Sequence, residues 1–176
     1  MRKFPLIVLC LFLSAGMGHA QTQNNGSLTG LKQITFTMGS PDNAPNKAAL
    51  ACGITPALIR DAAMYPLSAT RLKILEETPS QQSASTLLDV PIFDLTSGTV
   101  RDTSGLCFST IHLEVIIMQW SQASFASVPR WHHVVLWENG WFGYSATPQH
   151  AKQIRDEIEV LTKKFVTEWN SDNKPQ

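Results

Sequence analysis

The chain has 176 residues, and its 14 basic and 14 acidic side chains give no formal net charge at pH 7. This balance, without a basic stripe, argues against nucleic acid or an anionic membrane surface as the main partner. The length suits a single domain with a substantial hydrophobic core.

The first 20 residues have the pattern of a secretory signal peptide. Two basic residues, Arg2 and Lys3, precede an apolar run at 6–13 that is too short to cross a membrane, and small residues end the segment at Ala20. Cleavage there would leave 12 basic and 14 acidic residues, a net charge of about −2. We therefore expect an exported protein, periplasmic or secreted, with no transmembrane segment in the mature chain.

Two cysteines, Cys52 and Cys107, remain after the predicted cleavage, because Cys10 lies in the leader. A single cysteine pair in an exported chain most simply forms a disulfide. This bridge would close a long loop and stabilise the fold by about 4 kcal/mol on the chain-entropy model. A catalytic thiol or a redox pair would need a nearby base or a CxxC motif, and the sequence shows neither.

The N-terminal half predicts a tail, a strand and a helix in that order. Residues 21–30 are polar and indicate a flexible tail, and alternation at 31–38 indicates a strand. Thr55 and Pro56 predict a helix start, because threonine caps the first turn and proline at the first helical position loses no hydrogen bond. Pro66 should end or kink this helix.

Three further strands are predicted before residue 121. The first covers 71–76, and the second covers 87–95, where Pro91 cannot donate to a ladder and so indicates a sheet edge or a bulge. A turn-rich connector follows at 97–105. The longest strand signal covers 106–120, and both of its faces are apolar toward the far end, so both should be covered there.

The stretch PRWHHVVLWENGWFGY at 129–144 holds three of the five tryptophans. Asn139 and Gly140 predict a type I′ hairpin turn, because both residues tolerate a positive φ. That turn would gather six side chains on one hairpin face: Trp131, His133, Val135, Trp137, Phe142 and Tyr144. Trp141 would lie on the opposite face with Leu136. Which of these faces the C-terminal helix covers stays open.

Thr147 and Pro148 repeat the cap-and-proline pattern and predict the start of a long helix. Its apolar stripe recurs at helical spacing: Ala151, Ile154, Ile158, Leu161, Phe165 and Trp169. Residues 172–176 should be a disordered tail. The element order predicts one α+β domain over residues 31–171. Its two layers would be a mostly antiparallel sheet of about five to six strands and two helices, after Thr55 and after Thr147, on one face.

Histidines and carboxylates offer weak candidates for a metal site. His112 and Glu114 share one face of the long strand, and His133 would join them if the hairpin pairs beside it, which would make a zinc or copper site. His132 cannot bind the same ion as His133, because neighbours in a strand point to opposite faces. No HExxH motif or Cys–His spacing supports such a site, and we expect no cofactor.

No catalytic motif stands out in the sequence. The GxSxG elbow is absent, and the serines are expected in loops without a paired histidine and aspartate. Asp89, Asp94 and Glu114 are candidates for the two carboxylates of glycoside cleavage, but the sequence does not place them together. We do not expect an enzyme.

The surplus of strand aromatics is the feature that stands above background. A two-layer domain leaves one sheet face without helices, and rings on that face indicate an interface. We expect a non-enzymatic binding or structural module that contacts another envelope or secreted protein, or a second copy of itself. The predicted contact residues are Trp131, His133, Trp137, Trp141, Phe142 and Tyr144. The alternative is a hydrolase, or a small-molecule- or metal-binding protein, that uses His112, Glu114 and His133.

Overall fold

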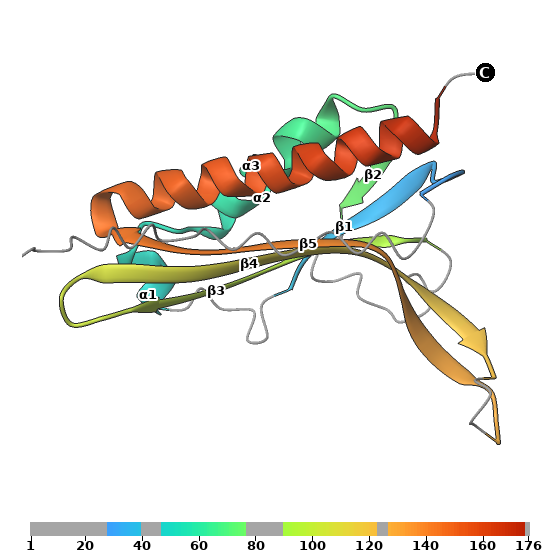
Figure 1. Ribbon diagram of the computed structural model, residues 1–176, viewed down its shortest axis with the longest axis horizontal. Helices are drawn as coiled ribbons and strands as arrows, with labels where there is room; N and C mark the ends of the chain where they lie inside the picture. Colours follow the sequence, from blue (N-terminus) through green and yellow to red (C-terminus); the bar gives the residue numbers. More distant parts are fainter. Residues whose placement is uncertain (1–27, 40–46, 77–89, 123–126, 175–176) are drawn as a thin grey trace, which may run out of the picture.

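The computed structural model describes residues 28–39, 47–76, 90–122 and 127–174. In chain order the elements are β1 (Gln33–Gly39), α1 (Lys47–Ala51), α2 (Pro56–Ser68), β2 (Lys73–Glu76), β3 (Ile92–Arg101), β4 (Leu106–Ser121), β5 (Arg130–Ala146) and α3 (Thr147–Asp172). Figure 1 shows the long helix α3 running over the strands, and β4 with β5 forming the longest ribbon. The predicted leader at 1–20 lies outside the described residues.

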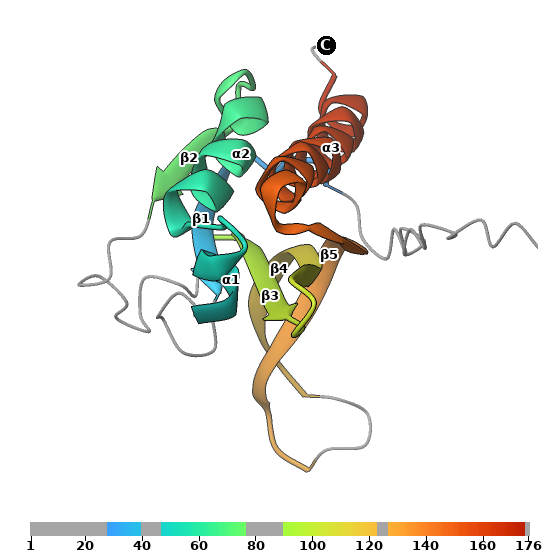
Figure 2. The same ribbon diagram turned by 90° about the vertical axis from the view of Figure 1, so that its left-hand side faces the viewer.

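The five strands form one sheet in the order β2-β1-β3-β4-β5. Helices α2 and α3 lie side by side on one face, as Figures 1 and 2 show. The prediction of an α+β fold with two layers is confirmed. The sheet is mixed rather than mostly antiparallel, because β1 runs parallel to both β2 and β3. Helices α1 and α2 separate β1 from β2, and a helical crossover returns the chain in the same direction.

Strand β3 corrects the predicted edge strand at 87–95. It lies inside the sheet between β1 and β4, and it continues to Arg101 through the segment predicted as a connector. Pro91 precedes the first residue of the strand, and its carbonyl accepts a hydrogen bond from the Thr35 N–H at 2.8 Å. A proline in that place removes no donor from the ladder, so it does not force an edge. Residues 87–89 lie outside the described part of the chain.

Strand β5 shows that the predicted turn at Asn139 and Gly140 is wrong. The strand runs unbroken for 17 residues, with Asn139 opposite Leu113 and Gly140 opposite His112 in β4. Gly140 is not among the described glycines with positive φ. A Cβ at this position would lie 3.1 Å from the Ile111 carbonyl, so glycine serves here for close backbone approach. The long partner strand continues the ladder past the local turn signal.

A bulge changes the phase of β5 near its middle. Val115 is paired with Trp137, but the next residue, Ile116, is paired with Val135, so Leu136 is an extra residue in β5. An extra residue moves the side chains that follow it to the opposite face. Trp137 therefore lies on the other face from Val135, which the sequence pattern alone does not indicate.

The two long helices begin as predicted, with one difference in capping. The Thr55 hydroxyl accepts from the Leu58 N–H at 3.2 Å and caps α2, which continues past Pro66 to Ser68. Helix α3 begins at Thr147, but its N-cap is Ala146, with no side-chain cap bond. The Thr147 hydroxyl donates instead to the Gly105 carbonyl at 2.8 Å, so it ties the helix start to the sheet.

The end of α3 holds the N-terminal part of the described domain. The Leu28 N–H donates to Asp172 at 3.0 Å, the Gly30 N–H donates to the Asn173 side chain at 2.7 Å, and the Trp169 indole donates to the Leu31 carbonyl at 2.8 Å. Residues 28–30 of the predicted tail therefore belong to the packed domain, and Leu28 is buried. Residues 21–27 lie outside the described chain. Asp172 and Asn173 likewise belong to the packed domain rather than to a tail. Residues 175–176 lie outside the description.

The core lies between the sheet and the helices α2 and α3. Phe165 of α3 packs edge-on against Trp137 of β5 and Phe93 of β3, with ring centroids 5.4 and 5.1 Å apart. The predicted disulfide is confirmed: Cys52, just after α1, is bonded to Cys107 in β4. The bridge joins the helix layer to the sheet across a sequence separation of 55 residues.

Candidate functional site

The sheet has a helix-covered face and an open face that carries no helix in the described chain (Figure 1). Alternation along β4 and β5 sorts their side chains between the two. The helix-covered face receives Cys107, Ser109, Ile111, Leu113 and Val115 of β4, and Trp137, Asn139 and Trp141 of β5. The open face receives the intervening residues, and several of its large apolar side chains are about half exposed.

The far end of the ribbon is a two-stranded arm, residues 116–121 and 130–135. Strand β3 begins opposite Ile116, so beyond this point β4 has β5 as its only partner among the described strands. Figure 1 shows the arm bending away from the sheet on the side opposite α3. The bend follows the bulge at Leu136, and bulges increase strand curvature and twist.

The arm presents a pair of tryptophans near its tip. Trp120 and Trp131 lie opposite each other, with ring centroids 5.4 Å apart in an edge-to-face arrangement. They are 56% and 44% exposed, although tryptophan is highly buried on average. An isolated two-stranded ribbon gains little stability of its own. The rings therefore make a protruding apolar surface.

A second aromatic cluster, Phe108, Phe142 and Tyr144, lies on the open face near the other end of β4 and β5. Phe108 stacks on Tyr144 with centroids 5.7 Å apart. Phe142 is 54% and Tyr144 is 50% exposed, and Val100 of β3 lies opposite Phe108 in the sheet. This cluster and the arm are separate apolar surfaces on one ribbon.

Carboxylates lie between the two aromatic surfaces. Asp94, Glu114 and Glu138 are directly opposite one another on β3, β4 and β5. The Asp94 carboxylate accepts from the Thr37 hydroxyl at 2.5 Å, and Glu138 is 3.7 Å from the His112 ring. Like charges side by side on a sheet are unfavourable. Positively charged groups would therefore relieve the repulsion within this acidic row.

The structure does not bring the predicted metal ligands together. His112 and Glu114 share the open face, but His133 lies on the arm opposite Met118, six residues along β4 from His112. Strands rise about 3.3 Å per residue, so His133 lies roughly 20 Å from His112 and roughly 13 Å from Glu114 along the sheet. The described residues contain no cluster of three histidine, cysteine or acidic side chains that could hold a metal. Asp89 of the predicted carboxylate set lies outside the described chain.

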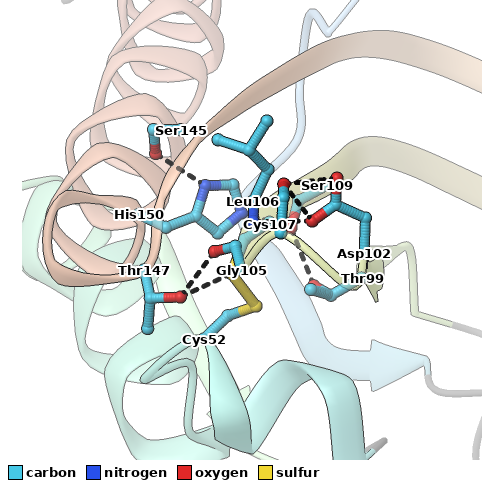
Figure 3. Close-up of a disulfide and its surroundings, with 11 residues drawn as sticks. Cys52, Thr99, Asp102, Gly105, Leu106, Cys107, Ser109, Ser145, Thr147 and His150 are labelled. Carbon is cyan, nitrogen blue, oxygen red and sulfur yellow. Dashed lines mark hydrogen bonds between the residues drawn. A yellow bond between two sulfur atoms is a disulfide. The ribbon is translucent and has the colours of Figure 1, made fainter.

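A buried serine–histidine pair was missed by the sequence reasoning, which placed the serines in loops. Ser109 lies in β4, and its hydroxyl is 2.8 Å from His150 Nε2; His150 Nδ1 is 2.8 Å from the Ser145 hydroxyl (Figure 3). Ser109 also bonds to Thr99 at 2.8 Å. The pair resembles a nucleophile and base, but Ser109 and His150 are buried, so a substrate cannot reach them. The signal that could have found the pair is the spacing of Ser109 along β4 and of His150 along α3, because it places both side chains toward the core.

The predicted interaction residues divide between the two faces. Four of them, Trp131, His133, Phe142 and Tyr144, lie on the open face and are at least partly exposed. The other two, Trp137 and Trp141, are buried beneath the helices, which corrects their assignment to an interaction surface. The Trp137 indole donates to Glu168 of α3 at 3.0 Å, so α3 covers it directly. The open question of which face the helix covers is thereby answered.

The fold and this surface describe a small α+β domain with an aromatic open face. No protein-family model and no curated protein matches the chain. Two solved structures are similar at 8% sequence identity: the PelC dodecamer from Paraburkholderia phytofirmans and a point variant of that dodecamer from the same organism. The first match covers 83% of this chain and 96% of the PelC chain, with a TM-score of 0.45. The second covers 85% of this chain and 98% of the variant chain, with a TM-score of 0.43.

None of the described helices combines the length and the apolar character that a membrane span demands.

Proposed function

We propose that this chain is an exported, non-enzymatic module that binds another protein through the open face of its sheet. The observation that carries the proposal is the set of half-exposed rings on that face: Trp120 and Trp131 on the arm, Phe142 and Tyr144 in the second cluster. Aromatic side chains bury large areas when a partner covers them, and they dominate the energy of many interfaces. Two such clusters on one ribbon suit an extended contact.

The acidic row defines the chemistry of the partner. Asp94, Glu114 and Glu138 lie between the two aromatic surfaces, so a bound protein must meet negative charge flanked by apolar rings. A partner surface with apolar patches around lysine or arginine side chains complements this pattern. Charge complementarity of this kind speeds association, and salt should weaken it.

The disulfide supports the export part of the proposal. Cys52 and Cys107 are buried and bonded to each other. Disulfides of this kind persist in oxidising compartments and are rare in the cytosol. A signal peptide at 1–20, cleaved near Ala20, remains a prediction from the sequence.

Capture of partners from the native envelope or medium tests the binding surface. Wild type should be compared with the double variants Trp120→Ala/Trp131→Ala and Phe142→Ala/Tyr144→Ala. Tyr65→Ala is a matched control, because Tyr65 is a 68% exposed aromatic on α2, in the helix layer. We expect the two double variants to lose a protein that wild type and the control retain, with the same melting temperature.

The retained protein should then be purified and its affinity measured at two salt concentrations. A partner of the proposed kind binds more weakly at high salt and at least about tenfold more weakly to either double variant, since one aromatic hot spot contributes about 2 kcal/mol. Size-exclusion chromatography distinguishes a second copy as the partner. Equal binding by all variants, with no change in oligomer size, would refute the proposed surface.

A further inference from the structure

His150 is a buried histidine that the proposed binding function does not use. It lies in the first turn of α3 with no solvent exposure, and its two ring nitrogens are each 2.8 Å from a serine hydroxyl. A neutral imidazole has one donor and one acceptor nitrogen, and the hydroxyls of Ser109 and Ser145 can supply the complementary roles. The hydrogen-bonding capacity of the neutral ring is therefore filled.

A protonated His150 would be a buried charge. Ser109 and Ser145 could accept from both nitrogens of the imidazolium, but two neutral hydroxyls do not replace the solvation that the charge would lose. Burial lowers the pKa of His150 below the ordinary histidine value. The N-terminus of α3, where backbone N–H groups carry partial positive charge, acts in the same direction.

The charged side chains near this corner are engaged elsewhere. On α3 itself, Lys152 pairs with Asp156 on the exposed side of the helix. In the turn between β3 and β4, the Asp102 carboxylate accepts hydrogen bonds from within its own turn. Strand β3 offers the neutral Thr99 to the network, and the nearby disulfide is also neutral. Burial is the largest cause of the lowered pKa of His150, and these charges do not offset it.

The same corner covers the disulfide. Thr147, the first residue of α3, has its hydroxyl 3.5 Å from Cys107 Sγ and donates from it to the Gly105 carbonyl (Figure 3). Cys52 and Cys107 have no solvent exposure. From Ile154 onward α3 is held by its apolar stripe. If His150 left its buried position, the first turn of α3 would therefore separate from the sheet before the rest of the helix.

We propose that His150 is an acid-sensitive latch: protonation of its imidazole releases the first turn of α3 from the sheet and uncovers the Cys52–Cys107 disulfide. The released turn binds a proton more readily than the closed one, so the latch is fully closed above about pH 6.5, the ordinary histidine value. Its stability falls as the pH drops below that value, by at most about tenfold in the opening equilibrium per pH unit.

Reduction of the disulfide by a water-soluble phosphine tests the latch in the intact protein. Rates are measured between about pH 7.5 and about pH 5, where histidine changes charge, and are divided by the rate for an unstructured disulfide peptide. We expect the corrected rate of wild type to rise about tenfold toward the acid end. His150→Gln keeps a polar side chain that does not titrate, and its corrected rate should not depend on pH. His132→Gln, on the arm, should behave like wild type.

Equal pH dependence of reduction in wild type and His150→Gln would overturn the proposal. NMR titration of the wild-type ring gives a second test that holds even if the glutamine variant fails to fold. The latch requires that the His150 ring in the folded protein stays neutral at pH values below the ordinary histidine pKa of about 6.5. An ordinary titration of His150 without loosening of the first turn would refute the latch.

Discussion

Two tryptophan pairs of the β4–β5 ribbon have opposite environments. Trp137 and Trp141 of β5 are buried beneath the helices, whereas Trp120 and Trp131, on the arm, are about half exposed. The residue type is the same, and Trp131 shares β5 with the buried pair, so neither the residue type nor the strand decides the outcome. What differs is the bulge at Leu136, which changes the phase of β5, and the reach of α3, which does not cover the arm. Hydrophobicity alone therefore does not assign a strand tryptophan to the core.

The buried pair should be essential to stability. Trp137→Ala removes a ring that packs on Phe165 and donates to Glu168, and it leaves a cavity between the layers. We expect a loss of about 3–5 kcal/mol in the free energy of unfolding, measured by urea denaturation. A loss below about 1 kcal/mol would show that the two layers close readily around the missing ring. It would contradict the contrast between the buried and the exposed tryptophans.

The disulfide lies on the helix-covered side of the sheet. Replacing both Cys52 and Cys107 with alanine should cost about 2–4 kcal/mol, because the bridge closes a long loop in the unfolded chain. The melting temperature should fall by about 10 °C while the circular dichroism spectrum of the folded protein is retained. Titration of the native wild type should find no free thiol at these two positions, and two reactive thiols would contradict the bridge.

Glycines on the two faces should respond differently to an added methyl group. A Cβ at Gly143 would lie 2.0 Å from the Trp141 ring, whereas at Gly98, on the open face, it would meet only the Thr110 hydroxyl at 3.2 Å. Gly143→Ala should destabilise by about 1–3 kcal/mol through overpacking. Gly98→Ala is the matched control and should change stability by less than about 0.5 kcal/mol. Equal effects would mean that the indole of Trp141 moves aside freely.

The exposed pair should matter least for stability. Trp120→Ala and Trp131→Ala each remove a half-exposed ring whose contact with the other is worth about 0.5–1.5 kcal/mol at most. We expect melting temperatures within a few degrees of wild type for both variants, together with the loss of binding described above. A large drop in melting temperature would assign these rings to the fold rather than to a partner.

Local and periodic features were predictable from the sequence. Thr55 caps α2 because the cap depends on neighbours in the chain, and the stripe ending at Trp169 follows from helical spacing alone. The pairing of Cys52 with Cys107 follows from their number. These signals need no knowledge of what lies next to them in space.

Features decided by tertiary contact were not predictable in the same way. Asn139 and Gly140 carry a strong turn signal, but the sixteen-residue β4 offers a ladder that overrides it. The predicted turn does not form, and the bulge at Leu136 was not predicted. Each of these differences moves the side chains that follow it to the opposite face of the sheet. Their effects cancel for Phe142 and Tyr144 relative to Trp131, so these three still share a face, whereas Trp137, lying between the two errors, was misplaced.

The hydrogen bonds that join the two ends of the domain have a practical consequence. Leu28 is bonded to both Asp172 and Asn173, so the first and last parts of the packed chain leave from one corner. Figure 1 shows that the C-terminal end of α3 lies on the side of the helix layer. A tether attached after residue 174 would hold the domain by its helices and present the aromatic strands outward. A short linker between these ends would also allow new termini to be opened elsewhere without cutting the core.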